Sequence, residues 1–189
     1  MSRPPPGNHT GTAHIDQVPH HGFGAPPPGP PLRITILGLG NTLFSDEGVG
    51  VHALPLLREA LRDVPGIEFI EGGTDGLRLL GPVEAAEALI VIDAVDANQP
   101  PGTVLVLEAE DIPAVMTPKL SVHQVAFSEV LFLTKLRGTT PRRLKMVGVQ
   151  PQSLEMGLAL SDTVRERLGD VIAAVRRIID EWMDEHEST

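Results

Sequence analysis

The stretch ILGLGNTLFSDEGVG, residues 36–50, joins an apolar run to a glycine-rich turn and then to the start of a predicted helix. An apolar, β-branched run of this kind is typical of a buried parallel strand, so we predict a strand over residues 33–39. In open parallel sheets, binding sites form outside the carboxyl ends of the strands. The turn after this strand is therefore predicted to border a site.

The turn does not fit a nucleotide site. Gly38 and Gly40 match the dinucleotide fingerprint G-x-G-x-x-G, but Leu43 occupies the third glycine position, and the Gly-Lys-Ser/Thr of a P-loop is absent. Asp46 and Glu47 stand where a phosphate would bind, and two unit charges ~4 Å apart at an effective dielectric of ~20 repel by ~4 kcal/mol. That repulsion exceeds the ~0.3–1 kcal/mol that a helix dipole supplies. We therefore favour a site built from side chains.

Strand and helix patterns alternate along the rest of the chain. The further predicted strands cover residues 67–73, 88–95, 103–108 and 143–150. The predicted helices cover residues 48–63, 75–88, 121–138 and 162–185. Pro55 is expected to kink the first helix or confine it to later residues, and Gly81-Pro82 to interrupt the second. The pattern predicts an α/β fold: a three-layer αβα domain with a twisted, mainly parallel five-stranded sheet and helices on both faces.

Residues 1–31 differ in composition from the rest of the chain. They hold nine of the 18 prolines, five of the 19 glycines and four of the seven histidines. Such a segment buries too little apolar area to offset its ordering entropy, so we predict a disordered leader over residues 1–31 and one folded domain over residues 32–189. We favour a solvated linker over a metal-scavenging tail, because spaced histidines on a flexible chain do not preorganise a site.

Composition excludes several classes of function. The net charge of −10 disfavours binding to nucleic acid or to an anionic membrane, since both need basic patches. No apolar run approaches the ~20 residues of a membrane span, and no signal-peptide pattern opens the chain. The chain has no Cys, so a metal site must use His, Asp or Glu. We expect a cytoplasmic protein.

Three candidate metal ligands fall at predicted strand ends or helix starts. Glu47 follows the first strand, Asp93 closes the apolar run ALIVI, and His123 opens a helix. Two carboxylates and an imidazole suit nickel, zinc, iron or manganese, and three protein ligands leave coordination positions open. Each residue also has a structural alternative: a cap at a helix start for Glu47, a turn cap for Asp93, and a surface position for His123. For Asp46, the neighbour of Glu47, we expect the helix cap.

Five ordered blocks of the sequence resemble the hydrogenase maturation endopeptidases. The blocks, within residues 33–180, are GLGNTLFSDEGVGVHAL, EFIEGGTDGLRLLG, LIVIDAVDA, LSVHQVAFSEVL and LKMVGVQPQSLEMGLALSDTV. The HQ and FSEVL residues are most similar to members that serve uptake-type [NiFe] hydrogenases. The resemblance implies a peptidase domain over residues 32–189 that removes a C-terminal extension from the hydrogenase large-subunit precursor after nickel insertion. Pro55 and the proline-rich leader depart from the family pattern.

The resemblance also implies a site. Its metal-binding positions fall on Glu47, Asp93 and His123, which would complete the coordination of a nickel ion carried by the substrate. We therefore expect the isolated protein to bind nickel, or another divalent transition metal, only weakly.

The remaining expectations concern the substrate and the water nucleophile. Asn41 and the turn residues Gly72, Gly73 and Thr74 are expected to line the cleft and hold the substrate backbone. Either a metal-polarised water or a carboxylate base, Glu47 or Asp93, supplies the nucleophile. We expect the precursor as the only macromolecular partner and a monomeric enzyme. The alternative function is a non-catalytic nickel-binding chaperone that assembles the large subunit.

Overall fold

The computed structural model describes residues 1, 31–115 and 122–188, with backbone alone for residues 114, 115 and 122–126. The leader predicted for residues 1–31 therefore lies almost entirely outside the described residues. Among the described residues, no helix combines the length and apolar character needed to cross a membrane.

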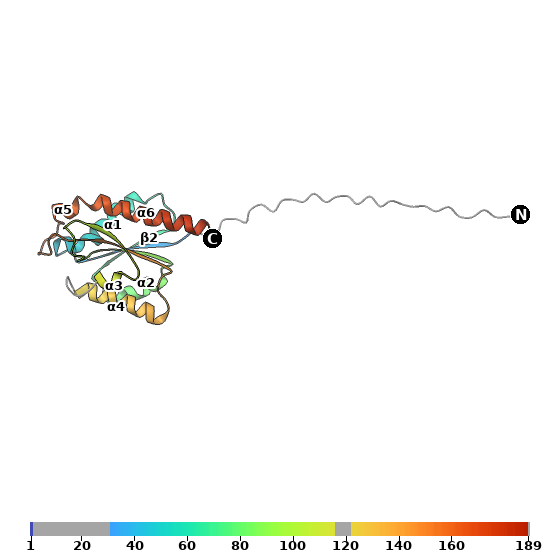
Figure 1. The fold of residues 1–189 in the computed structure, drawn as a ribbon, viewed down its shortest axis with the longest axis horizontal. Helices are drawn as coiled ribbons and strands as arrows, with labels where there is room; N and C mark the ends of the chain where they lie inside the picture. Colours follow the sequence, from blue (N-terminus) through green and yellow to red (C-terminus); the bar gives the residue numbers. More distant parts are fainter. Residues whose placement is uncertain (2–30, 116–121, 189) are drawn as a thin grey trace.

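All five predicted strands are confirmed, with ends within one residue of those expected. They are β1 (Ile34–Leu39), β2 (Ile67–Gly73), β3 (Ala88–Ala94), β4 (Val104–Glu108) and β5 (Arg143–Val149). The sheet order is β2-β1-β3-β5-β4, with every neighbouring pair parallel except β4 and β5. We call the edge where the four parallel strands β1, β2, β3 and β5 end the carboxyl edge; α5 lies at this end of the molecule (Figure 1).

Helices cover both faces of the sheet, as predicted (Figure 1). The helical elements are η1 (Ser45–Gly48), α1 (Val49–Ala60), η2 (Gly76–Leu79), α2 (Leu80–Ala85), α3 (Ile112–Val115), α4 (Val122–Arg137), α5 (Asp162–Arg165) and α6 (Leu168–Glu187). α1 and α6 pack on one face, and α2 and α4 on the other. Side chains alternate along β3, so Ile90 and Ile92 meet α1 and α6, while Leu89 and Val91 face α2 and α4.

The prediction for Pro55 is wrong in one respect, because α1 is not confined to residues after it. The helix begins at Val49 and runs through Pro55 to Ala60. Interior proline costs about 3 kcal/mol. Burial of an aliphatic side chain contributes about 1.5–3 kcal/mol, and α1 buries Val49, Leu54 and Leu57 completely or nearly so. Packing against the sheet therefore outweighs the lost hydrogen bond.

Two other helix predictions need correction. The break expected at Gly81-Pro82 lies earlier, where η2 passes into α2 at Leu80. Pro82 then falls in the first turn of α2, where its missing N–H leaves no hydrogen bond unmade. The single helix expected over residues 162–185 is divided into α5 and α6. Ser161 caps the start of α5 by accepting a hydrogen bond from the Val164 N–H at 3.3 Å.

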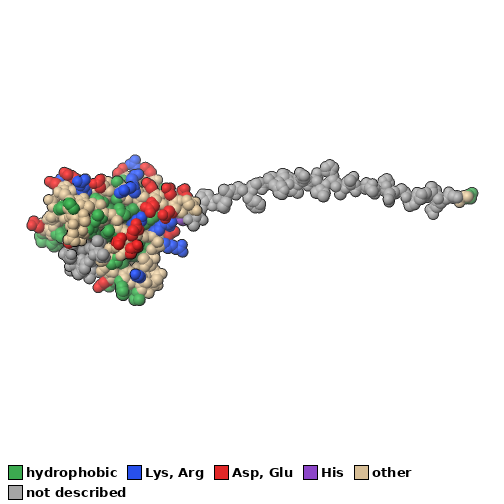
Figure 2. All heavy atoms as spheres, in the orientation of Figure 1, with side chains coloured by type: hydrophobic (Ala, Val, Ile, Leu, Met, Phe, Trp, Pro, Cys, Tyr) green, Lys and Arg blue, Asp and Glu red, His purple; other side chains and the backbone are tan. Residues whose placement is uncertain are grey.

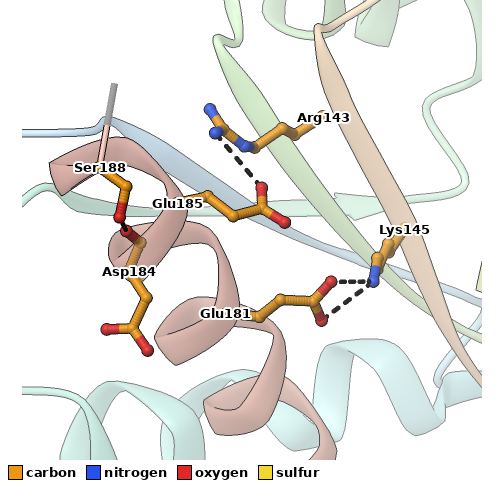
Figure 3. A network of polar contacts seen from close by, with 6 residues as sticks. All are labelled: Arg143, Lys145, Glu181, Asp184, Glu185 and Ser188. Atoms are coloured by element: carbon orange, nitrogen blue, oxygen red, sulfur yellow. Dashed lines mark hydrogen bonds and ion pairs between the residues drawn. The ribbon is translucent and has the colours of Figure 1, made fainter.

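An ion-pair network ties α6 to β5 and β4. Lys145 Nζ donates to Glu181 Oε1 and Oε2 at 3.0 and 3.1 Å (Figure 3). The same Nζ lies 3.2 Å from Glu108 Oε1. Arg143 donates to Glu185 beside it at 3.4 Å. Burial lowers the pKa of Lys145, but the hydrogen bonds and charges of Glu181 and Glu108 outweigh that effect, so its pKa lies above its ordinary value of 10.5.

We predict that this network makes stability fall at high pH. Because the folded pKa of Lys145 is raised, its contribution is fully present below pH 10.5 and is lost as the pH rises through the folded value. In urea unfolding between pH 8 and 11, the free energy of unfolding should change less with pH for Lys145→Met than for the wild type. The difference between the two changes should be less than about 1 kcal/mol. The exposed Lys135→Met is the matched control, and the chain has no Tyr or Cys to titrate in this range. Parallel curves for wild type and Lys145→Met would contradict the assignment.

Candidate active site

Asp93 is the penultimate residue of β3 and is fully buried. Its Oδ1 accepts a hydrogen bond from the Ala94 N–H at 2.8 Å, and its backbone lies opposite Gly148 of β5. Because side chains alternate along a strand, Asp93 points to the same face as Val91, the face covered by α4. The sheet thus fixes one carboxylate at the carboxyl edge.

Glu47 lies in η1, between β1 and α1, and is 5% exposed. Its N–H donates to the Phe44 carbonyl at 3.0 Å. The backbone of Gly40 runs so close to this turn that a Cβ at Gly40 would lie 1.8 Å from the Glu47 carbonyl oxygen, and Gly40 has a φ of 120°. Only glycine fits both conditions, so the turn brings Glu47 tightly over the end of β1.

The start of α1 brings Glu47 towards the end of β3. A Cβ on Gly50 would lie 2.1 Å from the carbonyl oxygen of Ile92, the residue before Asp93, and 2.4 Å from that of Leu39. Gly50 is therefore wedged between the ends of β1 and β3. Glu47 precedes it by three residues, about one helical turn, and η1 contacts β3 directly. The structure thus places two buried carboxylates, Glu47 and Asp93, at the carboxyl edge near the end of β3.

His123 lies in the first turn of α4, and its side chain falls outside the described part of the structure. The backbone places the start of α4 at the carboxyl edge, on the face of the sheet to which Asp93 points (Figure 1). Among the side chains that the structure describes, no three His, Asp or Glu residues group as a metal site. A metal site formed by Glu47, Asp93 and His123 therefore stays a prediction. The structure gives the positions of its two carboxylates.

Asp46 has a different role from its neighbour. Its carboxylate is completely buried and accepts N–H hydrogen bonds from Gln152 and Ser153, both at 2.9 Å, and from Ser161 at 2.7 Å. The Ser161 hydroxyl donates a fourth bond, at 2.8 Å. The expected helix cap is wrong, because Asp46 makes no capping bond in η1. It instead binds the loop that follows β5.

Backbone pairing joins the same two loops. Phe44 and Gly157 form an isolated parallel bridge, in which the Ser45 N–H donates to the Gly157 carbonyl at 2.8 Å and the Gly157 N–H donates to the Leu43 carbonyl at 2.9 Å. Ser45 adopts a φ of 43° to make this turn. We call the joined segments, residues 41–46 and 151–160, the rim loops.

The predicted substrate-binding residues all lie near the end of β1. The Gly40 N–H donates to the Gly73 carbonyl at 3.0 Å, which places Asn41 beside the turn after β2. Asn41 Oδ1 accepts a hydrogen bond from the Leu43 N–H at 3.0 Å, and Thr74 is exposed. Gly72 is buried, and a Cβ there would lie 2.7 Å from the Leu37 side chain, so its evident role is packing. Contact of these residues with substrate stays a prediction.

The sequence interpretation missed a pocket of about 400 Å³ beside this edge. Its lining includes Thr42, His52, Leu54, Arg58 and Leu158, from α1 and both rim loops. The Nε2 atom of His52 is buried and has no hydrogen-bond partner among the described residues. The periodicity of α1 predicts its apolar face, and nothing in that pattern indicates a pocket beside the helix.

The chemistry open to this edge follows from its two carboxylates. Burial removes water from Glu47 and Asp93, and a buried charge requires compensation by a hydrogen bond, a proton or a cation. Carboxylates in such a position can ligate a divalent ion or accept a proton from water. Both reactions are compatible with hydrolysis.

Comparison with known proteins assigns the chain to one family. A family model described as hydrogenase maturation protease matches residues 51–178. The hydrogenase expression/formation protein HupM of Azotobacter chroococcum is 43% identical over 143 residues, which are 75% of this chain and 68% of that protein. The hydrogenase 2 maturation protease of Escherichia coli is 38% identical over 150 residues, 77% of this chain and 92% of that protein.

Solved structures agree with the sequence matches. The hydrogenase maturating endopeptidase HybD of E. coli superimposes with a TM-score of 0.71 at 36% identity, over 79% of this chain and 93% of that one. The [NiFe] hydrogenase maturation protease HybD of Thermococcus kodakarensis gives a TM-score of 0.62 at 26% identity, over 78% and 99% of the two chains. The predicted fold class is thereby confirmed.

We predict that Asp46 stabilises the folded state strongly. Asp46→Ala would leave buried N–H donors of the rim loops without an acceptor, which should lower the free energy of unfolding by about 3 kcal/mol. Urea unfolding at pH 7 measures the loss. The exposed Asp63→Ala is the control and should change stability little. Equal stability of the two variants would show that the hydrogen bonds of Asp46 are replaced by water.

Proposed function

Because the chain belongs to the hydrogenase maturation protease family, we propose that it removes the C-terminal extension of a [NiFe] hydrogenase large-subunit precursor after nickel insertion. The observation that carries the proposal is the pair of buried carboxylates, Glu47 and Asp93, held at the carboxyl edge. In a hydrogenase maturation protease, such a pair is suited to sense a metal ion that arrives with the substrate.

The proposed recognition step uses the nickel ion of the precursor as part of the substrate. Glu47, Asp93 and His123 would complete its coordination, because carboxylate and imidazole are suitable ligands for a divalent transition metal. A precursor without nickel offers these groups no cation. This difference in binding would make cleavage follow metal insertion.

The proposed hydrolytic step needs a water nucleophile near the peptide bond. Nickel can lower the pKa of a bound water, and Glu47 or Asp93 can instead accept a proton as general base. Both routes use the same edge of the sheet and predict loss of activity when either carboxylate is replaced. The monomeric state and the cytoplasmic location stay predictions.

Mass spectrometry of the precursor tests this function. We expect the purified protein to shorten the nickel-loaded precursor and to leave the nickel-free precursor at full mass. Glu47→Gln, Asp93→Asn and His123→Gln should each lower the cleavage rate by about 100-fold or more, since each removes a ligand or a base. Asp75→Asn is the matched control, because Asp75 is an exposed carboxylate in the turn after β2.

Two results would contradict the assignment. Cleavage at the wild-type rate by Asp93→Asn and His123→Gln would remove those residues from the site. Stable binding of the nickel-loaded precursor without any loss of mass would indicate an assembly factor instead of a peptidase. Circular dichroism of each variant would show whether the fold is retained.

A further inference from the structure

We propose that Leu43, Met156 and Leu158 form an apolar docking rim that binds an apolar segment of the precursor beside the candidate active site. The three side chains are 55%, 83% and 74% exposed. Hydrophobic side chains also reach the surface at the end of the molecule where α5 lies (Figure 2). This inference rests on the proposed function, because it takes the precursor as the occupant.

Backbone pairing gathers the three residues of the docking rim. Leu43 adjoins Phe44, and Met156 and Leu158 flank Gly157, so all three are next to the partners of the bridge that joins the rim loops. The bond from the Gly157 N–H to the Leu43 carbonyl, at 2.9 Å, connects them directly. Residues more than 110 positions apart in the sequence thus present one apolar surface.

The fold holds this exposed surface in place through a buried charge. Asp46 binds Gln152, Ser153 and Ser161 with four hydrogen bonds, which fixes the loop that carries Met156 and Leu158. Apolar side chains held in water contribute nothing favourable to the free protein. The conformational entropy of the rim loops is already lost during folding. A partner that covers the three side chains therefore gains binding free energy with little further loss of entropy.

The position of the docking rim favours a substrate over a second copy of this chain. Asp46, which fixes the rim loops, is the chain neighbour of Glu47, so a segment seated on the rim lies next to the candidate active site. A second copy seated there would cover that site, and two chains of net charge −10 repel each other. Leu158 also lines the pocket of about 400 Å³, which has room for a side chain of the segment.

Steady-state cleavage of the nickel-loaded precursor tests the docking rim. Leu158→Ser and Met156→Ser should each raise KM about tenfold with kcat nearly unchanged, because they remove binding shared by the ground and transition states. Leu136→Ser is the matched control: Leu136 is 73% exposed, against 74% for Leu158, but lies in the last turn of α4, away from the carboxyl edge. All three variants should keep the wild-type melting temperature.

Binding measurements separate this inference from the proposed function. Interferometry with immobilised nickel-loaded precursor should show about tenfold weaker binding for Leu158→Ser than for Leu136→Ser. If the wild type binds and Leu158→Ser binds weakly but neither cleaves, the peptidase assignment fails and the docking rim stands. Equal affinities of the two variants would overturn the docking rim. If the wild type self-associates and Leu158→Ser does not, the surface binds a second copy of the chain. That result would also overturn the docking rim as a binding site for the precursor.

Discussion

The contact between the start of α1 and the ends of β1 and β3 is the constraint on which the site depends. Cβ atoms built on Gly38 and Gly50 would lie 2.4 Å from the Gly50 carbonyl oxygen and 2.1 Å from the Ile92 carbonyl oxygen, so both partners are backbone and cannot move aside. Any larger residue would push α1 from the sheet and carry Glu47 away from Asp93. Gly38, which matches part of a nucleotide fingerprint, thus serves with Gly50 the close packing of α1 on the sheet.

Much of the fold was predictable because it follows from local patterns. The apolar runs of β1 and β3 are buried on both faces, and such runs are continuous in the sequence. The helix at Pro55 was misjudged because propensity is local, whereas the packing of Leu54 and Leu57 against the sheet is not. The division of α5 from α6 falls at Glu166 and Arg167, whereas the nearby helix breaker in the sequence, Gly169, lies inside α6.

The candidate site was predictable only in part, because some of its interactions join residues that are far apart in the sequence. The positions of Glu47 and Asp93 at one edge were predictable because strand ends in parallel sheets converge there, while their part in a metal site stays a prediction. The role of Asp46 could not be predicted, because its partners lie 106–115 residues away and donate mainly through backbone N–H groups, which any residue except proline supplies. Two adjacent acidic residues therefore look alike in the sequence but differ in place: Asp46 binds the loop after β5, whereas Glu47 lies in η1, which contacts β3.

The separation of these two carboxylates bears on how a metal-bearing substrate is distinguished from an empty one. Asp46 is compensated within the fold by four hydrogen bonds, so an arriving cation gains little from it. Glu47 and Asp93 lie at the edge proposed to meet the substrate, and their burial gives an environment of low dielectric in which an added cation interacts strongly. Under the proposed function, a nickel-loaded precursor gains this attraction and a nickel-free precursor does not. Selectivity for the loaded precursor would then come from the placement of one carboxylate in a structural role and of its neighbour at the edge proposed to meet the substrate.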